Sequence, residues 1–145
     1  FTVYGPGENQ GRLLPSLIEC TKTSGKIPLT NGSQRRDFIY VEDVAQGLLR
    51  LGLTDGNKYK IVNLATGKLL SVKRFVETAA SLLKINAARL DFGTIPVRQE
   101  EMKHDPVTIK RLQDITKWQP AITIKEGIMQ TVKFLERLNR STVKK

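Results

Sequence analysis

Apolar residues follow two patterns along this chain, short β-prone runs and longer stripes at helical spacing. The runs are rich in β-branched and aromatic residues, and turn formers such as Gly5-Pro6-Gly7 and Asn31-Gly32 bound them, so they predict strands. The predicted strands are Phe1–Tyr4, Ile27–Thr30, Phe38–Val41, Tyr59–Leu64 and Leu90–Ile95.

Apolar residues spaced three and four positions apart predict five amphipathic helices between these strands. Their apolar faces are Leu13, Leu14, Leu17 and Ile18; Val41, Val44, Ala45 and Leu48; Val72, Phe75, Val76, Ala79 and Leu83; Ile109, Leu112 and Ile115; and Ile124, Ile128, Val132 and Leu135. Capping residues predict where the last three helices begin, at Ser71, at Asp105-Pro106 and at the capping box from Thr123 to Glu126. The apolar pattern fades after Asn139, so we expect a basic tail over 139–145.

The alternation of strands and helices is typical of an α/β protein. The strands are short and unevenly spaced, which favours one lobe of a larger α/β fold over a complete barrel or doubly wound sheet. The chain opens inside a predicted strand and without an initiator methionine, so we expect a piece of a longer protein. Strand edges and the apolar face from Val72 to Leu83 would then lose their partners, and we expect the isolated chain to associate or to be poorly soluble.

The net charge of +10 bears on possible binding partners, because it is compatible with nucleic acid, an acidic membrane or a small anionic ligand. Lysines and arginines are scattered through all 145 residues, and few aromatic residues alternate with them, which favours solvated charge over a nucleic-acid surface. No apolar run approaches the roughly 18 residues of a membrane span. The single cysteine, Cys20, is expected to pack beside Leu17, and the single histidine, His104, to lie on the surface.

Several kinds of catalytic motif are missing from the sequence. No glycine-rich phosphate loop follows a predicted strand, and Tyr4-Gly-Pro-Gly7 lacks the spacing of a dinucleotide fingerprint. The sequence contains no Walker motif and no second histidine or cysteine beside His104 that would complete a metal site. Candidate anion-binding residues remain, above all Arg36, which directly precedes the β-prone run from Phe38.

A set of segments, in order, resembles one known family. The segments are "VYGPGEN", "GRLLPSLI", "GKIPLTNGSQRRDFIYVEDVA", "YKIVNLATGKLLSV", "RQEEMKHD" and "KWQPAITIKEGI". Residues 1–138 resemble the C-terminal half of the NAD-dependent sugar-nucleotide epimerases and dehydratases, which are extended short-chain dehydrogenases. The resemblance implies an α/β fold made of the C-terminal substrate-binding lobe and the last strands of a Rossmann-type sheet. It also implies that the cofactor, NAD or NADP, is held by an N-terminal half with a Tyr-x-x-x-Lys pair, neither of which this sequence contains.

The same resemblance implies roles for individual residues. Arg36 matches an arginine that reaches the substrate's phosphates, and a guanidinium suits phosphate oxygens. The alternative is a solvated Arg36–Asp37 surface pair, which would be worth little. Arg98 matches a second arginine at the diphosphate, and Glu101 matches an acceptor for a ribose hydroxyl, although the family often has aspartate there and Glu100 could compete. No catalytic residue is expected in this chain.

The remaining implied contacts lie earlier in the chain. The helix start at Arg12 and Leu13 would approach the diphosphate, because free amides at a helix start favour an anion. Pro28, Leu29 and Thr30 match the strand that passes the nucleobase. Thr2 stands where many members have asparagine, and Tyr4 matches a weak contact with the cofactor.

Three functions therefore remain open. The first is the part of a sugar-nucleotide epimerase, dehydratase or reductase that binds a nucleoside-diphosphate sugar, inactive on its own, from a cytoplasmic parent that forms a homodimer. The second is a non-catalytic relative that binds a nucleotide or a protein. The third is a basic nucleic-acid-binding domain.

Overall fold

The computed structural model describes residues 1–55, 59–99, 101, 103 and 105–142, so Glu100 and His104 lie outside the described residues. The strands are β1 (Thr2–Tyr4), β2 (Ile27–Leu29), β3 (Arg35–Arg36), β4 (Phe38–Tyr40), β5 (Leu70–Ser71) and β6 (Leu90–Phe92). The helices are α1 (Leu13–Glu19), α2 (Val41–Gly52), α3 (Val72–Leu82), α4 (Lys110–Thr116) and α5 (Ile124–Thr142), with short 3-10 turns at Cys20–Lys22 and Ala87–Arg89.

The strands pair two by two. β1 lies parallel to β4 with Val3 opposite Ile39, and β2 lies parallel to β6 with Pro28 opposite Asp91. β3 and β5 are antiparallel, with Arg36 opposite Leu70. Parallel pairs joined by helices confirm the predicted α/β class with Rossmann-type pairing.

Aromatic rings form the centre of the core. The Phe38 and Phe75 rings stack with their centroids 4.2 Å apart, and Tyr4 meets both of them edge-on. Phe75 on α3 is 1 % exposed and Val76 is fully buried, because β1, β4 and α1 cover α3 within this chain. The expectation that the Val72–Leu83 face would lose its partner is therefore wrong for its central residues.

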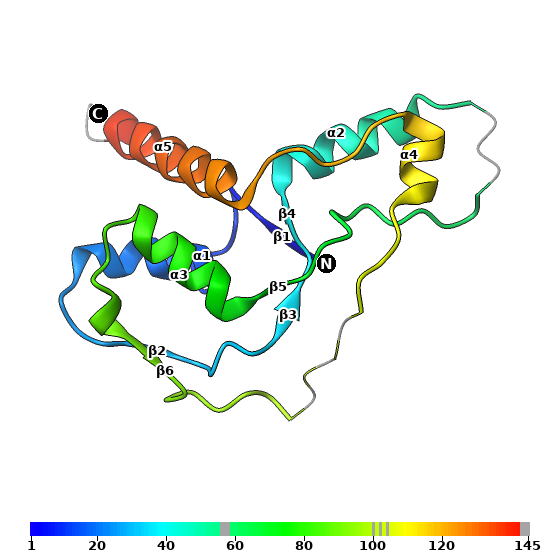
Figure 1. Cartoon of the computed structure of the whole chain (residues 1–145). Coiled ribbons are helices and arrows are strands. Elements are labelled where there is room, and N and C mark those ends of the chain that lie inside the picture. The colour runs from blue at the N-terminus through cyan, green and yellow to red at the C-terminus, as the bar shows by residue number, and fades with distance from the viewer. Residues whose placement is uncertain (56–58, 100, 102, 104, 143–145) are drawn as a thin grey trace.

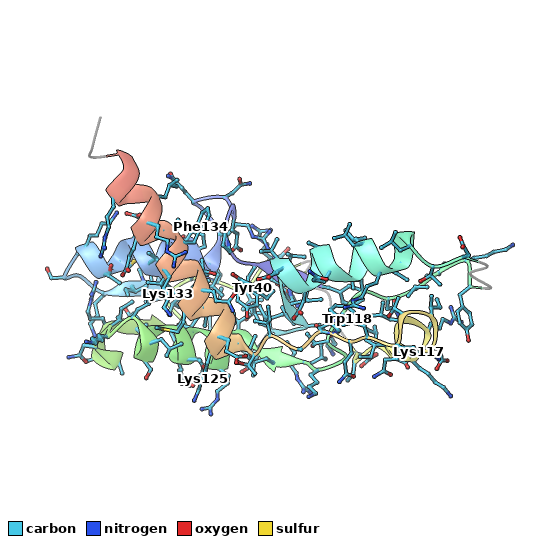
Figure 2. All side chains as sticks on the ribbon, turned by 90° about the horizontal axis from the view of Figure 1, so that it is seen from above. Tyr40, Lys117, Trp118, Lys125, Lys133 and Phe134 are labelled. Atoms are coloured by element: carbon cyan, nitrogen blue, oxygen red, sulfur yellow. The ribbon has the colours of Figure 1, made fainter. Side chains whose placement is uncertain are left out.

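The helices form two groups on either side of β1 and β4. Figures 1 and 2 show α1, α3 and α5 together on one side, and α2 with α4 on the other. In the second group Gly47 lets α2 approach closely, because a Cβ there would lie 2.3 Å from Leu64 and 3.0 Å from Trp118. The guanidinium of Arg50 lies 5.8 Å from the centroid of the Trp118 ring.

The predicted apolar face of α2 is partly wrong. Leu48 is 59 % exposed and Ala45 is also exposed, whereas Asp43 and Gly47 are buried. Asp43 tolerates burial because its carboxylate accepts hydrogen bonds from two amides of the segment before α5, at Ala121 and Ile122. The hydrogen bonds of Asp43 and the close packing of α2 at Gly47 replace the expected apolar contacts.

Two further expectations are wrong. The run from Tyr59 to Leu64 is not a strand. It is irregular, with Leu64 beside Gly47 of α2 and the Asn63 amide donating to the Thr108 carbonyl. Asp105-Pro106 does not begin a helix, since α4 begins at Lys110, where the Thr108 hydroxyl accepts from the Lys110 amide.

The other two caps are confirmed. The Ser71 hydroxyl accepts from the Arg74 amide at the start of α3. At α5 the Glu126 carboxylate accepts from the amide and hydroxyl of Thr123, and the Thr123 hydroxyl accepts from the Glu126 amide. The Thr123 hydroxyl lowers the pKa of Glu126, because it stabilises the ionised carboxylate. α5 then continues to Thr142, beyond Asn139, where the sequence pattern fades.

The apolar face of α1 is confirmed as well. Leu14 and Leu17 are each 1 % exposed, and Cys20 packs partly buried against the same core. Within the described part of the chain, no helix is long and apolar enough to cross a membrane.

Candidate functional site

Arg36 is held by the strand and the loop on either side of it. It lies on β3 opposite Leu70, and the next residue, Asp37, is 4 % exposed. The Asp37 carboxylate accepts from the Thr66 amide at 2.9 Å, the Thr66 hydroxyl at 2.8 Å and the Gly67 amide at 2.8 Å. A solvated Arg36–Asp37 surface pair is therefore wrong, because Asp37 is an internal anchor that fixes the backbone beside Arg36.

Arg36 and Glu101 are brought together from distant parts of the sequence. Nη2 of Arg36 forms an ion pair with Oε1 of Glu101, and the two side chains are only 21 % and 24 % exposed. Nη1 of Arg36 also donates to the Arg35 carbonyl at 2.9 Å. Two predicted site residues thus contact one another directly.

A cavity of about 210 Å³ lies beside this ion pair, between β1, α1, β3 and α3. We call it the Arg36 pocket. It is lined by Thr2, Tyr4, Glu8, Arg12, Leu13, Leu14, Arg36, Phe38, Val72 and Phe75. Five of the predicted site residues, from three separate segments, line this one cavity.

A second cavity, of about 450 Å³, adjoins the first because Leu13 and Val72 line both. We call it the Arg98 pocket. Its lining includes Pro28, Leu29, Thr30, Phe92, Ile95 and Arg98. The Glu101 amide donates to the Arg98 carbonyl at 3.1 Å, a turn that connects this pocket to the Arg36–Glu101 ion pair. All the predicted site residues therefore line two adjoining cavities or pair with a residue that does.

Glu8 belongs to this site, and the sequence analysis missed it. Its Oε1 accepts from Nε of Arg12 at 3.0 Å, and its side chain is only 8 % exposed. Its Oε2 is buried with no hydrogen-bond partner among the described residues. The Glu8–Arg12 spacing of four residues was visible in the sequence, but its burial follows from the fold of the Gly5–Gly7 turn over α1.

Tyr4 lines the Arg36 pocket but is mainly a core residue. It is 2 % exposed, and its hydroxyl donates to the Thr123 carbonyl at 3.5 Å. Burial raises the pKa of Tyr4 well above its ordinary value, so the hydroxyl stays protonated. A contact between Tyr4 and a cofactor stays a prediction.

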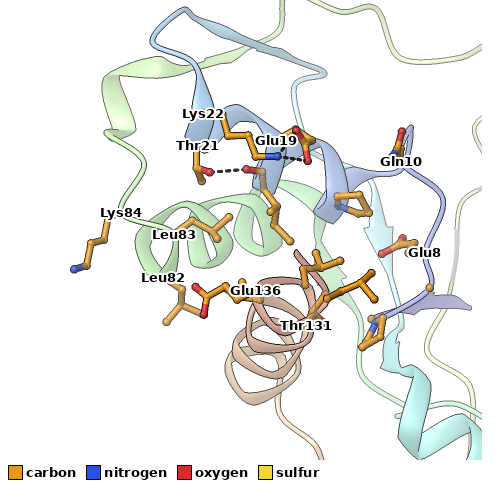
Figure 3. A pocket seen from close by; sticks show the side chains of 18 residues that line it. Glu8, Gln10, Glu19, Thr21, Lys22, Leu82, Leu83, Lys84, Thr131 and Glu136 are labelled. Atoms are coloured by element: carbon orange, nitrogen blue, oxygen red, sulfur yellow. Dashed lines mark hydrogen bonds and ion pairs between the residues drawn. The ribbon is translucent and has the colours of Figure 1, made fainter. Parts of the chain in front are cut away.

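A larger cavity, of about 520 Å³, lies between α1, α3 and α5 (Figure 3). Glu8 lines it, as do Glu136 on α5 and the Glu19–Lys22 ion pair. None of the site residues predicted from the sequence lines this cavity. Among the described residues, no cluster of histidine, cysteine and carboxylate side chains is suited to a metal ion.

Comparison with known proteins supports the predicted resemblance to NAD-dependent epimerases and dehydratases, whereas the assignment to their C-terminal half stays a prediction. Residues 1–65 match the NAD dependent epimerase/dehydratase family. CDP-abequose synthase from Salmonella typhimurium is 30 % identical over 137 residues, which span 92 % of this chain and 46 % of that protein. UDP-glucuronate 4-epimerase from Thermodesulfobacterium geofontis is 30 % identical over 138 residues, which span 92 % of this chain and 41 % of that enzyme.

A solved structure is also similar to this chain. UDP-N-acetylglucosamine 4-epimerase from Methanobrevibacter ruminantium, in complex with UDP-N-acetylmuramic acid, has a TM-score of 0.77 and 26 % identity. The match covers 94 % of this chain and 44 % of that one. The chain thus spans less than half the length of these relatives.

The glycine turn after β1 does not fit the pyrophosphate of a dinucleotide. Gly5 follows β1, but the position of a Cβ there lies 2.7 Å from Val41 and 3.0 Å from Tyr40, so this glycine faces the core. A glycine that cradles a pyrophosphate would instead face the ligand.

Proposed function

We propose that this chain binds the nucleoside diphosphate of a nucleotide sugar, as the substrate-binding part of an NAD(P)-dependent epimerase, dehydratase or reductase. The observation that carries the proposal is the convergence of the predicted residues. Segments around Thr2, Arg12, Pro28, Arg36 and Arg98 are far apart in the sequence, and they line two adjoining cavities.

The chemistry of these cavities suits the two halves of such a ligand. Arg12 and Arg36 offer guanidinium groups in the smaller cavity, where phosphate oxygens would be held. The Arg98 pocket combines apolar side chains such as Pro28, Leu29 and Phe92 with hydrogen-bonding groups on Ser16, Thr30 and Arg98, a lining that suits a nucleobase.

The relatives favour the same ligand class. The enzymes named above act, by their names, on CDP-linked and UDP-linked sugars. Catalysis is assigned to a parent protein, because this sequence contains no Tyr-x-x-x-Lys pair.

Calorimetric titration of the chain with UDP, CDP and uridine tests the proposal. We expect both diphosphates to bind at least about tenfold more tightly than uridine, because a charge-assisted phosphate contact contributes roughly 1.5–3 kcal/mol. Raising the salt concentration should weaken the diphosphates and leave uridine unchanged. Equal affinity for UDP and uridine would contradict a phosphate-binding site.

A further inference from the structure

The Glu101 carboxylate pairs with the same guanidinium, that of Arg36, which is expected to hold the phosphate. Both side chains are about four-fifths buried, at 21 % and 24 % exposure. A carboxylate and a phosphate oxygen are both anionic acceptors for the same guanidinium N–H groups. The described structure therefore shows Arg36 already satisfied by an anion from its own chain.

The contacts of Arg36 show which group a phosphate would have to displace. Nη1 donates to the Arg35 carbonyl, which fixes the plane of the guanidinium, and Nη2 pairs with Glu101. A phosphate that approaches Nη2 must displace the Glu101 carboxylate or accept its repulsion. Release of Glu101 to solvent loses the ion pair, but its carboxylate gains hydration, and the side chain is already 24 % exposed.

We propose that Glu101 competes with the ligand for Arg36, so that an anion that binds through Arg36 must first displace this carboxylate. The inference rests on the proposed function, because it takes Arg36 to be the phosphate contact. The ion pair lowers the fraction of chains in which Arg36 is free for a ligand. Glu101 thus weakens the binding of every anion that needs Arg36, and by the same factor for each.

Competition for Arg36 and acceptance of a ribose hydroxyl predict different changes in ligand affinity when Glu101 is removed. If Glu101 mainly accepted a hydroxyl, its removal would weaken a nucleoside diphosphate and leave inorganic pyrophosphate unchanged. If it competes for Arg36, its removal tightens pyrophosphate binding. Pyrophosphate is therefore the probe that separates the two roles, because it has no ribose.

The experiment measures pyrophosphate and acetate affinity by calorimetry for the wild-type chain, Glu101→Gln, Arg36→Ala and the double variant. We expect Glu101→Gln to tighten pyrophosphate about two- to fivefold, and to tighten acetate by a similar factor. In the double variant the substitution of Glu101 should have no effect, because Arg36 is absent. Glu136→Gln is the matched control, since it removes the same charge from the other cavity (Figure 3) and should leave both affinities unchanged.

The outcomes separate this inference from the proposed function. If Arg36→Ala leaves pyrophosphate affinity unchanged, Arg36 is not the phosphate contact and both fail. If Arg36→Ala weakens binding while Glu101→Gln leaves it unchanged or weakens it, only the competition is overturned. If Glu136→Gln tightens pyrophosphate as much as Glu101→Gln does, the effect is general charge and the inference is overturned as well.

Discussion

Replacement of Asp37 by asparagine should destabilise the chain by about 2–4 kcal/mol. The carboxylate is 4 % exposed and accepts from two backbone amides and one hydroxyl, at Thr66 and Gly67. Asparagine keeps one acceptor oxygen, but its amide nitrogen would face the Gly67 amide, which is also a donor. At least one buried N–H is then left without a partner.

Urea unfolding followed by circular dichroism measures this effect. Asp114→Asn is the control, since Asp114 is exposed on α4, and it should change the free energy of unfolding by less than about 0.5 kcal/mol. Thr66→Ala removes the hydroxyl that donates to Asp37 and accepts from the Lys68 amide, and it should cost about 1 kcal/mol. It therefore reports on the same anchor if Asp37→Asn does not fold. An Asp37→Asn variant as stable as the wild type would show that this anchor does not hold β3 in place.

Replacement of Arg36 by alanine should weaken UDP binding by about tenfold to a hundredfold. The guanidinium lines the Arg36 pocket at 21 % exposure, so its loss removes a charge-assisted contact that water screens only in part. Arg36→Lys should recover only part of the affinity, because an ammonium group lacks the planar fork of donors.

The matched control for Arg36 is its neighbour. The Arg35 side chain is exposed, and only its backbone carbonyl contacts Arg36, so Arg35→Ala removes the same charge and keeps that contact. We expect UDP affinity in Arg35→Ala to stay within about twofold of the wild type, since exposed charges contribute little. Equal losses in the two variants would indicate general electrostatic attraction in place of a specific contact.

Much of this fold was predictable because local patterns agreed with tertiary packing. The apolar spacing of α1 and α5 and the caps at Ser71 and Thr123 use only neighbours within a few residues, and all of them are confirmed. The errors arise where distant segments override local preference. Residues 59–64 have strand-like composition, but they pack beside Gly47 on α2 and not beside another strand.

The site was predictable only in part. The resemblance to a family supplied the individual residues, whereas composition and spacing supplied only a set of possible anion contacts. Neither could show that Arg36 is paired with Glu101 or that Oε2 of Glu8 is buried without a partner, because both depend on how loops fold over α1 and β3. The sequence did not distinguish Asp37 from an exposed aspartate. Only its hydrogen bonds with Thr66 and Gly67 show that it fixes the backbone beside Arg36.

The central claim is that a nucleoside diphosphate binds at the two adjoining cavities on α1, β2 and β3. Hydrogen exchange measured by mass spectrometry, with and without saturating UDP, tests it most directly because it locates the ligand on the chain. We predict slower exchange in peptides that contain Arg12–Leu14 and Pro28–Arg36. We predict no change in peptides from residues 132–138 of α5, four of which line the separate cavity of about 520 Å³ between α1, α3 and α5. Slower exchange confined to α5, with none around Arg36, would contradict the account.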